Sequence, residues 1–165
     1  MSSAEGPTTG HFLWRVVLKW RSSVDRALAP LELTHAQYSL LASLYGLSRS
    51  GYCPSQRELA DFSGLEAMYV SKLARALEDN GLLERESNPL DPRAVQLRIT
   101  PRGQKVTGAA MRIVRTLEDQ LLAPLGGRAS PRSAALREML QALLGEMSSS
   151  SPTRSTTESM PAASG

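Results

Sequence analysis

The sequence predicts a mainly α-helical chain that carries one small β-hairpin. Apolar residues recur every three to four positions along most of the 165 residues, which is the period of helices that bury one face. The period changes to two between residues 82 and 99, where Val95, Leu97 and Ile99 alternate with polar residues. Capping residues and prolines then divide the helical part into separate segments.

The first helix is expected over residues 12–28, after residues 1–10, which are small and polar and which we expect to be disordered. A second helix begins at Thr34, whose spacing to Gln37 is that of a capping box. Residues 46–54 are then expected to form a loop. The predicted buried stripe of the first helix is Leu13, Val16, Val17, Trp20, Val24 and Leu28.

Two shorter helices come next. Ser55 and Glu58 form a second capping box at the start of the first of them. Residues 63–65 interrupt the pattern, and the following helix, residues 66–80, ends at Gly81, which suits a left-handed backbone position. The residues predicted to face inward are Leu59, Ala60, Phe62, Val70, Leu73, Ala74 and Leu77.

The hairpin is expected to have strands at residues 82–87 and 95–99, with a tip near Asp91. Arg93 lies at this tip beside prolines that stiffen it, and an arginine on a narrow finger suits the minor groove of DNA. Asp91 can pair with Arg93 and fix its direction. The alternative is an ordinary surface ion pair, which contributes little energy.

Two helices complete the chain. Thr100 and Pro101 start a long helix that is expected to end near Leu122, and Ser130 repeats the start signal for the last helix. The Ser-rich tail, residues 148–165, lacks the apolar content to fold and is expected to be disordered. The predicted apolar stripes are Val106, Ala110, Ile113, Leu117 and Leu121, then Leu136, Met139, Leu140, Leu143 and Leu144.

Composition narrows the function classes. No apolar run reaches the roughly 18 residues of a membrane span, and no secretory signal begins the chain, so we expect a cytoplasmic protein. Cys53 is the one cysteine, and His11 and His35 lack metal-ligand spacing, so we expect no disulfide, metal site or cofactor. No nucleophile motif, carboxylate pair or phosphate-binding glycine loop points to an enzyme.

The net charge of +3 is distributed unevenly. Residues 92–117 contain no Asp or Glu, which is typical of a surface that binds a polyanion. The alternative is a solvated helix face. The cations of this segment are Arg93, Arg98, Arg102, Lys105, Arg112 and Arg115.

A short helix, a tight turn, a second helix and a hairpin follow one another in the order of a winged helix-turn-helix. In that fold the second helix buries one face and presents the other to the major groove. At about 100° per residue, residues 66–80 place two cations opposite their buried stripe, although Asp79 would repel phosphate. The residues on or beside this face are Met68, Tyr69, Ser71, Lys72, Arg75 and Asp79. The alternative is that these are solvent-exposed charges of an amphipathic helix.

Four segments together resemble the MarR (multiple-antibiotic-resistance regulator) family. They are residues 33–41, 58–60, 70–85 and 91–103, which resemble the second helix, the two DNA-reading helices, and the wing with the start of the long helix. The resemblance extends over about residues 11–147. It implies a homodimer in which residues 11–33 and 101–147 form the dimerisation region and residues 34–100 bind a pseudo-palindromic double-stranded DNA operator.

The resemblance also implies site residues and release from DNA by a small aromatic or phenolic ligand. By position, it gives the groove-facing role to Ser71, Lys72 and Arg75, the wing role to Arg93, and phosphate contacts to Gln56 and Arg57. The full set of candidate DNA-binding residues is Ser55, Gln56, Arg57, Met68, Tyr69, Ser71, Lys72, Arg75, Asp91, Arg93 and Arg98. Many family members have small polar residues where Met68 and Tyr69 stand, which suggests an unusual base preference. Redox-sensing members carry a cysteine near the start of the first helix, so the position of Cys53 disfavours peroxide sensing.

An effector pocket between the first two helices would be lined by aromatic rings and one arginine, which suit an aromatic acid. Its candidate residues are His11, Trp14, Arg15, Trp20, Tyr38 and Tyr45. The alternative for these six is core and dimer packing. For the whole chain, the alternative function is a winged-helix protein–protein interaction module without sequence-specific DNA binding.

Overall fold

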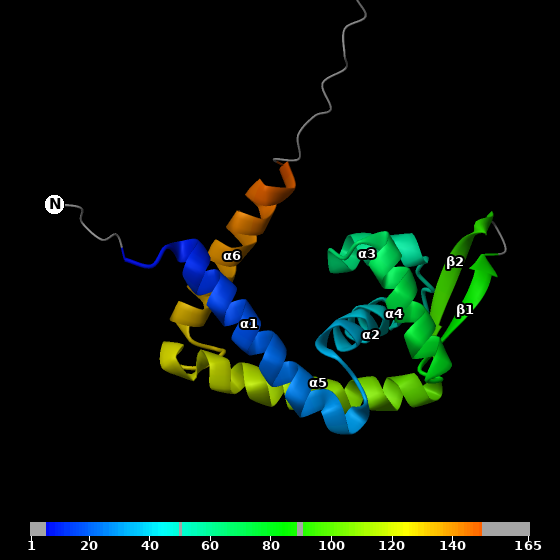
Figure 1. Ribbon diagram of the computed structural model, residues 1–165, viewed down its shortest axis with the longest axis horizontal. Helices are drawn as coiled ribbons and strands as arrows, with labels where there is room; N and C mark the ends of the chain where they lie inside the picture. Colours follow the sequence, from blue (N-terminus) through cyan, green and yellow to red (C-terminus); the bar gives the residue numbers. More distant parts are fainter. Residues whose placement is uncertain (1–5, 50, 89–90, 150–165) are drawn as a thin grey trace, which may run out of the picture. The chain divides into compact units, whose positions relative to one another are not determined.

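A computed structural model describes residues 6–49, 51–88 and 91–149 of the chain, although the side chains of residues 92, 93 and 146–149 lie outside this description (Figure 1). The predicted mainly helical fold with a single hairpin in this part of the chain is confirmed. The elements are α1 (Thr9–Leu28), η1 (Ala29–Leu31), α2 (His35–Ser48), α3 (Gln56–Ser63), α4 (Ala67–Asp79), β1 (Leu83–Asn88), β2 (Asp91–Ile99), α5 (Pro101–Leu122), η2 (Ala123–Leu125) and α6 (Pro131–Ser149). The described residues form two compact units, which divide between residues 118 and 119.

The predicted capping boxes at Thr34 and Ser55 are both present, so α2 and α3 begin where the sequence indicates. The expected loop at residues 46–54 is wrong at its start, because α2 continues to Ser48. Leu47 packs against the hydrophobic core, and tertiary packing of this kind overrides the low helix propensity of a glycine such as Gly46.

The core of the first unit lies among the end of α1, helices α2, α3 and α4, and the hairpin. Its fully buried members include Leu28, Leu44, Leu59, Leu77 and Leu97. Burying apolar side chains of this size stabilises the fold by about 1.5–3 kcal/mol each.

Two predictions about the core are wrong. Phe62 is 63% exposed, because it lies on the outer side of α3, whose buried side is formed by Leu59 and Ala60. In α1 only Val24 and Leu28 are buried, whereas the predicted stripe residues of its N-terminal half, among them Val17, are exposed. The periodicity was therefore detected correctly, but half of the stripe is not covered by this single chain.

The hairpin is joined to the start of α3 by a short additional pairing. β1 and β2 are antiparallel, with Leu83 opposite Ile99. The backbone N–H of Leu97 donates to the Pro54 carbonyl at 2.9 Å, and Ser55 forms an isolated bridge with Gln96. The two residues that lead into α3 are thereby held against the second strand.

The start of α5 is fastened to the turn between α4 and β1. Gly81 has φ +67°, and the predicted left-handed position is confirmed. The Thr100 hydroxyl donates to the Gly81 carbonyl at 2.8 Å and accepts from the N–H of Gly103 at 2.9 Å. A Cβ on Gly103 would overlap the Leu82 carbonyl oxygen and lie 2.9 Å from Cγ1 of Ile99, so only glycine permits this approach.

In the second unit, η2 leads to α6. The Ser130 hydroxyl accepts from the N–H of Ser133 at 3.2 Å, as the predicted start signal requires. Buried Ser133 donates its hydroxyl to the Gly127 carbonyl at 2.8 Å. Most of the predicted apolar stripe of α6 is exposed, with Met139 at 58% and Leu144 at 65%.

The expected disordered ends are shorter than predicted where they can be described. Thr8 caps α1, which already begins at Thr9, and α6 continues through Ser149. Residues 1–5 and 150–165 lie outside the described residues. None of the helices in the described ranges is long and apolar enough to cross a membrane.

Candidate nucleic-acid interface

The outward face of α4 is the first part of the candidate interface. Val70, Leu73, Ala74 and Leu77 are buried, as predicted. The predicted orientation of the opposite face is confirmed, because a shallow groove along the helix is lined by Met68, Ser71, Lys72, Arg75, Ala76 and Asp79. Both cations of this face are exposed, and no ion pair is recorded for either within the described part of the chain.

The start of α3 is the second part. The Ser55 hydroxyl accepts from the N–H of Glu58 at 3.2 Å, while the N–H of Ser55 donates to Glu58 Oε2 at 2.7 Å. The hydroxyl of Tyr52 donates to the other carboxylate oxygen, Oε1, at 2.5 Å. This bond from Tyr52, followed by those from Ser55, lowers the pKa of Glu58, and the same bond is the main reason why the pKa of Tyr52 is raised.

Gln56 and Arg57 follow this cap in the first turn of α3. Arg57 is exposed, whereas Gln56 is partly buried and its Oε1 atom has no hydrogen-bond partner. Ser55, by contrast, already uses its hydroxyl and its N–H in the capping box. Of the three candidate DNA-binding residues at the start of α3, Arg57 is thus the one with an exposed charged group.

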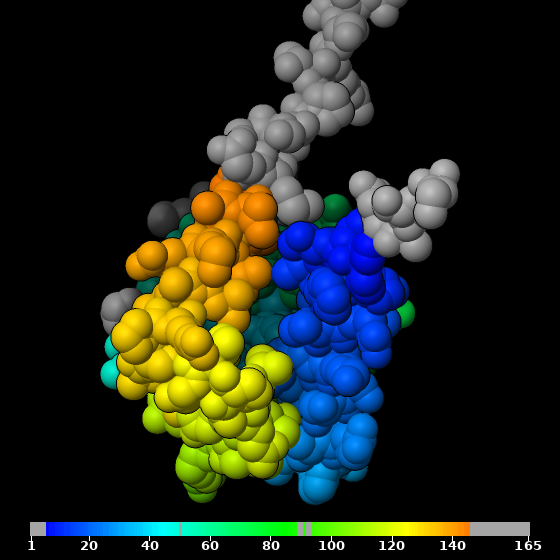
Figure 2. Space-filling view, turned by 90° about the vertical axis from the view of Figure 1, so that its left-hand side faces the viewer, coloured from blue at the N-terminus to red at the C-terminus, as the bar shows by residue number. Residues whose placement is uncertain are grey.

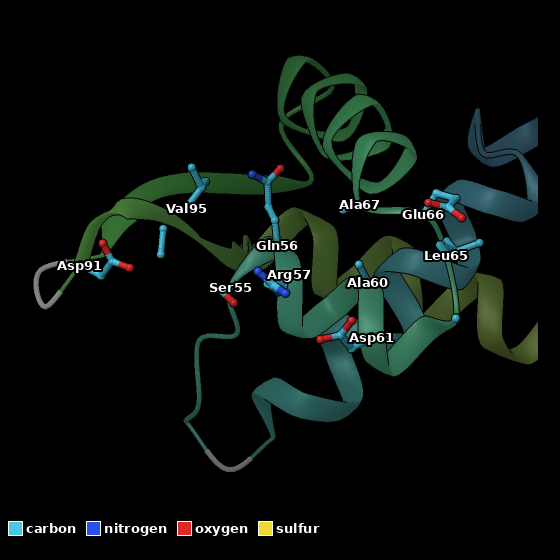
Figure 3. Close-up of a pocket in the computed structure, with 12 residues that line it drawn as sticks. Ser55, Gln56, Arg57, Ala60, Asp61, Leu65, Glu66, Ala67, Asp91 and Val95 are labelled. Carbon is cyan, nitrogen blue, oxygen red and sulfur yellow. The ribbon is translucent and has the colours of Figure 1, made fainter. Parts of the chain in front are cut away.

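An open hollow of about 940 Å³ lies between the start of α3, the α3–α4 turn and β2. Figure 3 shows side chains from these segments around it. Ala60, Leu65 and Val95 supply apolar wall, while Arg57 brings a positive charge. The remaining lining residues are Ser55, Gln56, Asp61, Gly64, Glu66, Ala67, Asp91 and Ala94.

Among the described side chains that line the hollow, negative charges outnumber positive ones. Asp61, Glu66 and Asp91 each contribute a carboxylate, and Arg57 contributes a guanidinium. Such a surface disfavours a phosphate that lies deep in the hollow, since like charges repel. The cationic groove of α4 and the exposed Arg57 are therefore better placed to contact a polyanion than the hollow itself.

The hairpin is the third part of the candidate interface. Asp91 is exposed and lies opposite Asn88 in the strand register. Arg98 forms an ion pair with Glu86 across the strands at 3.0 Å, so a phosphate would have to compete with this carboxylate. The backbone of Arg93 belongs to β2, whereas its side chain, to which the minor-groove prediction applies, lies outside the described residues.

The six candidate effector residues divide into two groups. Trp20, Tyr38 and Tyr45 pack against the hydrophobic core, and burial raises the pKa of the Tyr38 hydroxyl, with a further contribution from the charge of Glu118. His11, Trp14 and Arg15 are exposed on the N-terminal half of α1. None of the six lines either of the two hollows described above.

Two features of this surface were not predicted from the sequence. The acidic residues Asp61 and Glu66 line a hollow whose other side is formed by β2. The bridge that brings β2 to the start of α3, between Ser55 and Gln96, joins residues too far apart in the sequence for a local pattern to predict it. The hydrogen bond from Tyr52 to Glu58 was also not predicted. A tyrosine six positions before the glutamate of a capping box is the sequence feature that indicates it. Cys53 is a partly buried free thiol between these elements.

Comparison with known proteins places this arrangement in a family. The MarR family model matches residues 33–95. An uncharacterized HTH-type transcriptional regulator of Bacillus subtilis (strain 168), YdcH, is 38% identical over 124 residues, which are 74% of this chain and 84% of that protein.

Two solved structures of DNA complexes have the same fold. A mutant of MarR from E. coli complexed with operator DNA matches with a TM-score of 0.71 and 25% identity, covering 82% of this chain and 92% of that chain. The transcriptional repressor CouR, bound to a 23-mer DNA duplex, matches with a TM-score of 0.68 and 28% identity, covering 86% and 92%. The chain has a winged helix-turn-helix, matches the MarR family model, and is 38% identical to a transcriptional regulator over 74% of its length. This chain belongs to the MarR family of transcriptional regulators.

Proposed function

We propose that this protein is a homodimeric repressor that binds a pseudo-palindromic DNA operator through α4, the start of α3 and the hairpin. The observation that carries the proposal is the outward face of α4, where Lys72 and Arg75 lie exposed opposite a fully apolar buried stripe. A helix of this kind fits the major groove, where its N-terminal residues meet base edges and its cations meet phosphates.

The flanking elements add contacts on either side of α4. Arg57 at the start of α3 is exposed and suited to a phosphate. We assign the minor-groove contact to Arg93 because β2 carries its backbone in the same compact unit as α4. Arg98 is assigned a lesser role, since its pairing with Glu86 must be broken or shared.

The homodimer is supported by uncovered apolar surface. The N-terminal half of α1, the dark blue region in Figure 2, exposes Trp14 by 62%, Val16 by 50% and Val17 by 56%. Large apolar side chains at helical spacing typically mark an interface when they are exposed together. In the second unit, α6 likewise exposes Met139 and Leu144.

Effector control is proposed on the family's pattern. A small aromatic or phenolic ligand would release the protein from DNA by favouring a conformation with low DNA affinity. The exposed His11, Trp14 and Arg15 offer stacking and an anion-binding guanidinium, and a partner subunit would be needed to enclose them. A repressor of chromosomal genes would act in the cytoplasm.

The test is operator affinity in point variants of the full chain. An operator is first selected from random duplexes, and Kd is then measured by fluorescence anisotropy. Lys72→Ala and Arg75→Ala should each weaken binding about tenfold, because each loses a charge-assisted contact. Arg26→Ala, an exposed cation on α1, is the matched control and should bind like the wild type.

A further variant is expected to strengthen DNA binding instead of weakening it. Glu66→Gln removes one carboxylate from the hollow beside the N-terminus of α4 and should strengthen binding severalfold. If no duplex is selected at low salt, or if Lys72→Ala and Arg75→Ala both match Arg26→Ala, the proposal is wrong and a protein–protein module becomes the better description.

A further inference from the structure

Met68 is the most exposed of the large apolar side chains in the described part of the chain. It is 88% exposed, in the first turn of α4, and it lines the groove that also contains Lys72 and Arg75. Single exposed apolar residues are common on protein surfaces and usually need no explanation. Met68 differs from these in its position, since it lies on the same face of α4 as Lys72 and Arg75, nearer the N-terminus, and this face is proposed to enter the major groove.

A thioether restricts what such a side chain can recognise on DNA. Its sulfur is a weak acceptor and it has no donor, so methionine cannot make the paired hydrogen bonds by which Arg, Asn or Gln distinguish bases. The major-groove edges of the four base pairs offer one apolar group, the 5-methyl of thymine. A flexible and polarizable side chain is well suited to pack against it.

The neighbouring side chains set where this contact falls. Lys72 and Arg75 lie one and two turns further along the same face of α4 and would hold the helix against the phosphates. Recognition helices contact bases chiefly with their N-terminal residues, and Met68 is the second residue of α4. The N-terminal end of this face therefore presents the apolar side chain of Met68, while Ser71 and the two cations line the groove further along the helix.

We propose that Met68 is a specificity-determining residue that selects a thymine in each operator half-site by packing against its 5-methyl group. This rests on the proposed function, because it presupposes that α4 enters the major groove. It gives that function a stated base preference at the position beneath the first turn of α4.

The experiment uses the operator selected with the full-length protein. Each thymine is replaced in turn by uracil, which removes the methyl group and leaves every hydrogen-bonding group in place. For the wild type, one thymine position per half-site should show about threefold to fourfold weaker binding, the expected effect of losing one buried methyl contact. Replacement by 5-bromouracil, whose bromine fills the same space, should restore affinity.

Three variants assign the effect to a residue. Met68→Ala should bind the thymine and uracil duplexes equally, while Met68→Leu, which remains apolar, should keep the preference. Met111→Ala removes a methionine from α5 that is 38% exposed and should leave the thymine-to-uracil ratio unchanged. Because the readout is a ratio of two affinities for the same variant, a general loss of stability does not imitate it.

The outcomes separate the two proposals. Failure to bind any duplex contradicts the proposed function. Normal operator binding without a uracil effect at any position overturns the role of Met68 alone. A uracil effect that persists in Met68→Ala also overturns it and assigns the methyl contact to another residue of α4.

Discussion

Tyr52 donates a hydrogen bond to Glu58, a carboxylate in the first turn of α3. Glu58 already closes the capping box with Ser55, and the Tyr52 hydroxyl satisfies its second carboxylate oxygen. All of these bonds favour the charged carboxylate, which is why the pKa of Glu58 is lowered. A lowered pKa in the folded state stabilises the fold above the unfolded pKa, and this contribution is lost as the pH falls through the folded pKa.

Replacing Tyr52 by phenylalanine should therefore raise the pKa of Glu58 toward its ordinary value of 4.5, because the largest cause of the shift is removed. The measurement is an NMR titration of the Glu58 side-chain carboxyl carbon in the wild type and the variant. Tyr69→Phe, which alters an exposed phenol on α4, is the control and should leave the midpoint unchanged. An unaltered Glu58 midpoint in Tyr52→Phe would mean that this hydrogen bond is not formed in solution.

At the residue level, the predictions succeeded where a short spacing determines the contact. The Thr34 and Ser55 caps and the left-handed Gly81 all follow from neighbours within four residues, and each is confirmed. The prediction that Phe62 is buried was wrong, because the sequence of a helix of only eight residues does not determine which side is buried. The side that is buried depends on α4 and β2, which pack against α3 from elsewhere in the chain.

At the scale of elements, the joint between α5 and the α4–β1 turn holds the helix in place beside the hairpin. Three hydrogen bonds cross it, including one from the Arg102 guanidinium to the Asn80 carbonyl at 2.9 Å. Gly103 makes the joint possible because its missing side chain admits the Leu82 carbonyl.

Gly103→Ala should lower the free energy of unfolding by about 1–3 kcal/mol, since a methyl group must be forced against fixed backbone. Gly108→Ala, in the same helix, is the matched control. Its new methyl meets only the distant end of Arg112, at 3.9 Å, so it should raise stability by about 1 kcal/mol through helix propensity. Both are measured by urea denaturation at one protein concentration, and the account of the joint is wrong if the two variants change stability in the same direction.

Elements were predictable from the sequence where local patterns are strong, and less so where distant packing decides. The start of α5 at Pro101 and its end at Leu122 are as predicted, because a capping threonine, a proline and a long stripe all agree. The extension of α2 to Ser48 was missed, because Gly46 signals a break that packing of Leu47 overrides. The pairing of Pro54 with Leu97 was also missed, since no short motif joins residues so far apart.

At the scale of the whole molecule, the uncovered apolar residues of α1 lead to a prediction about assembly. Trp14→Glu places a charge on the exposed apolar surface and should shift the proposed dimer toward monomer, because an interfacial carboxylate would be desolvated without a partner. Ser22→Glu adds the same charge at an exposed polar position of α1 and should remain dimeric. Sedimentation velocity distinguishes the species, and a monomeric wild type at micromolar concentration would refute the assembly proposed here.

Ionic strength offers a second property of the whole complex. If the dimer contacts about 6–10 phosphates, its affinity should fall by roughly 10³–10⁵ between about 50 and 200 mM salt, because bound counterions are released from DNA. The small net charge of +3 does not limit this effect, since the salt dependence is set by the number of phosphates contacted and not by the net charge of the chain.

The central claim is that α4 and the hairpin together bind duplex DNA. Its most direct test is a hydroxyl-radical footprint, at low salt, on DNA adjoining the protein's own gene. We expect two protected half-sites with centres about 10 base pairs apart, or a multiple of this spacing, as two-fold related recognition helices require. The double variant Lys72→Ala/Arg75→Ala should leave the same fragment unprotected. Protection that persists unchanged in this variant, or a fragment that the wild type never protects, would contradict the account.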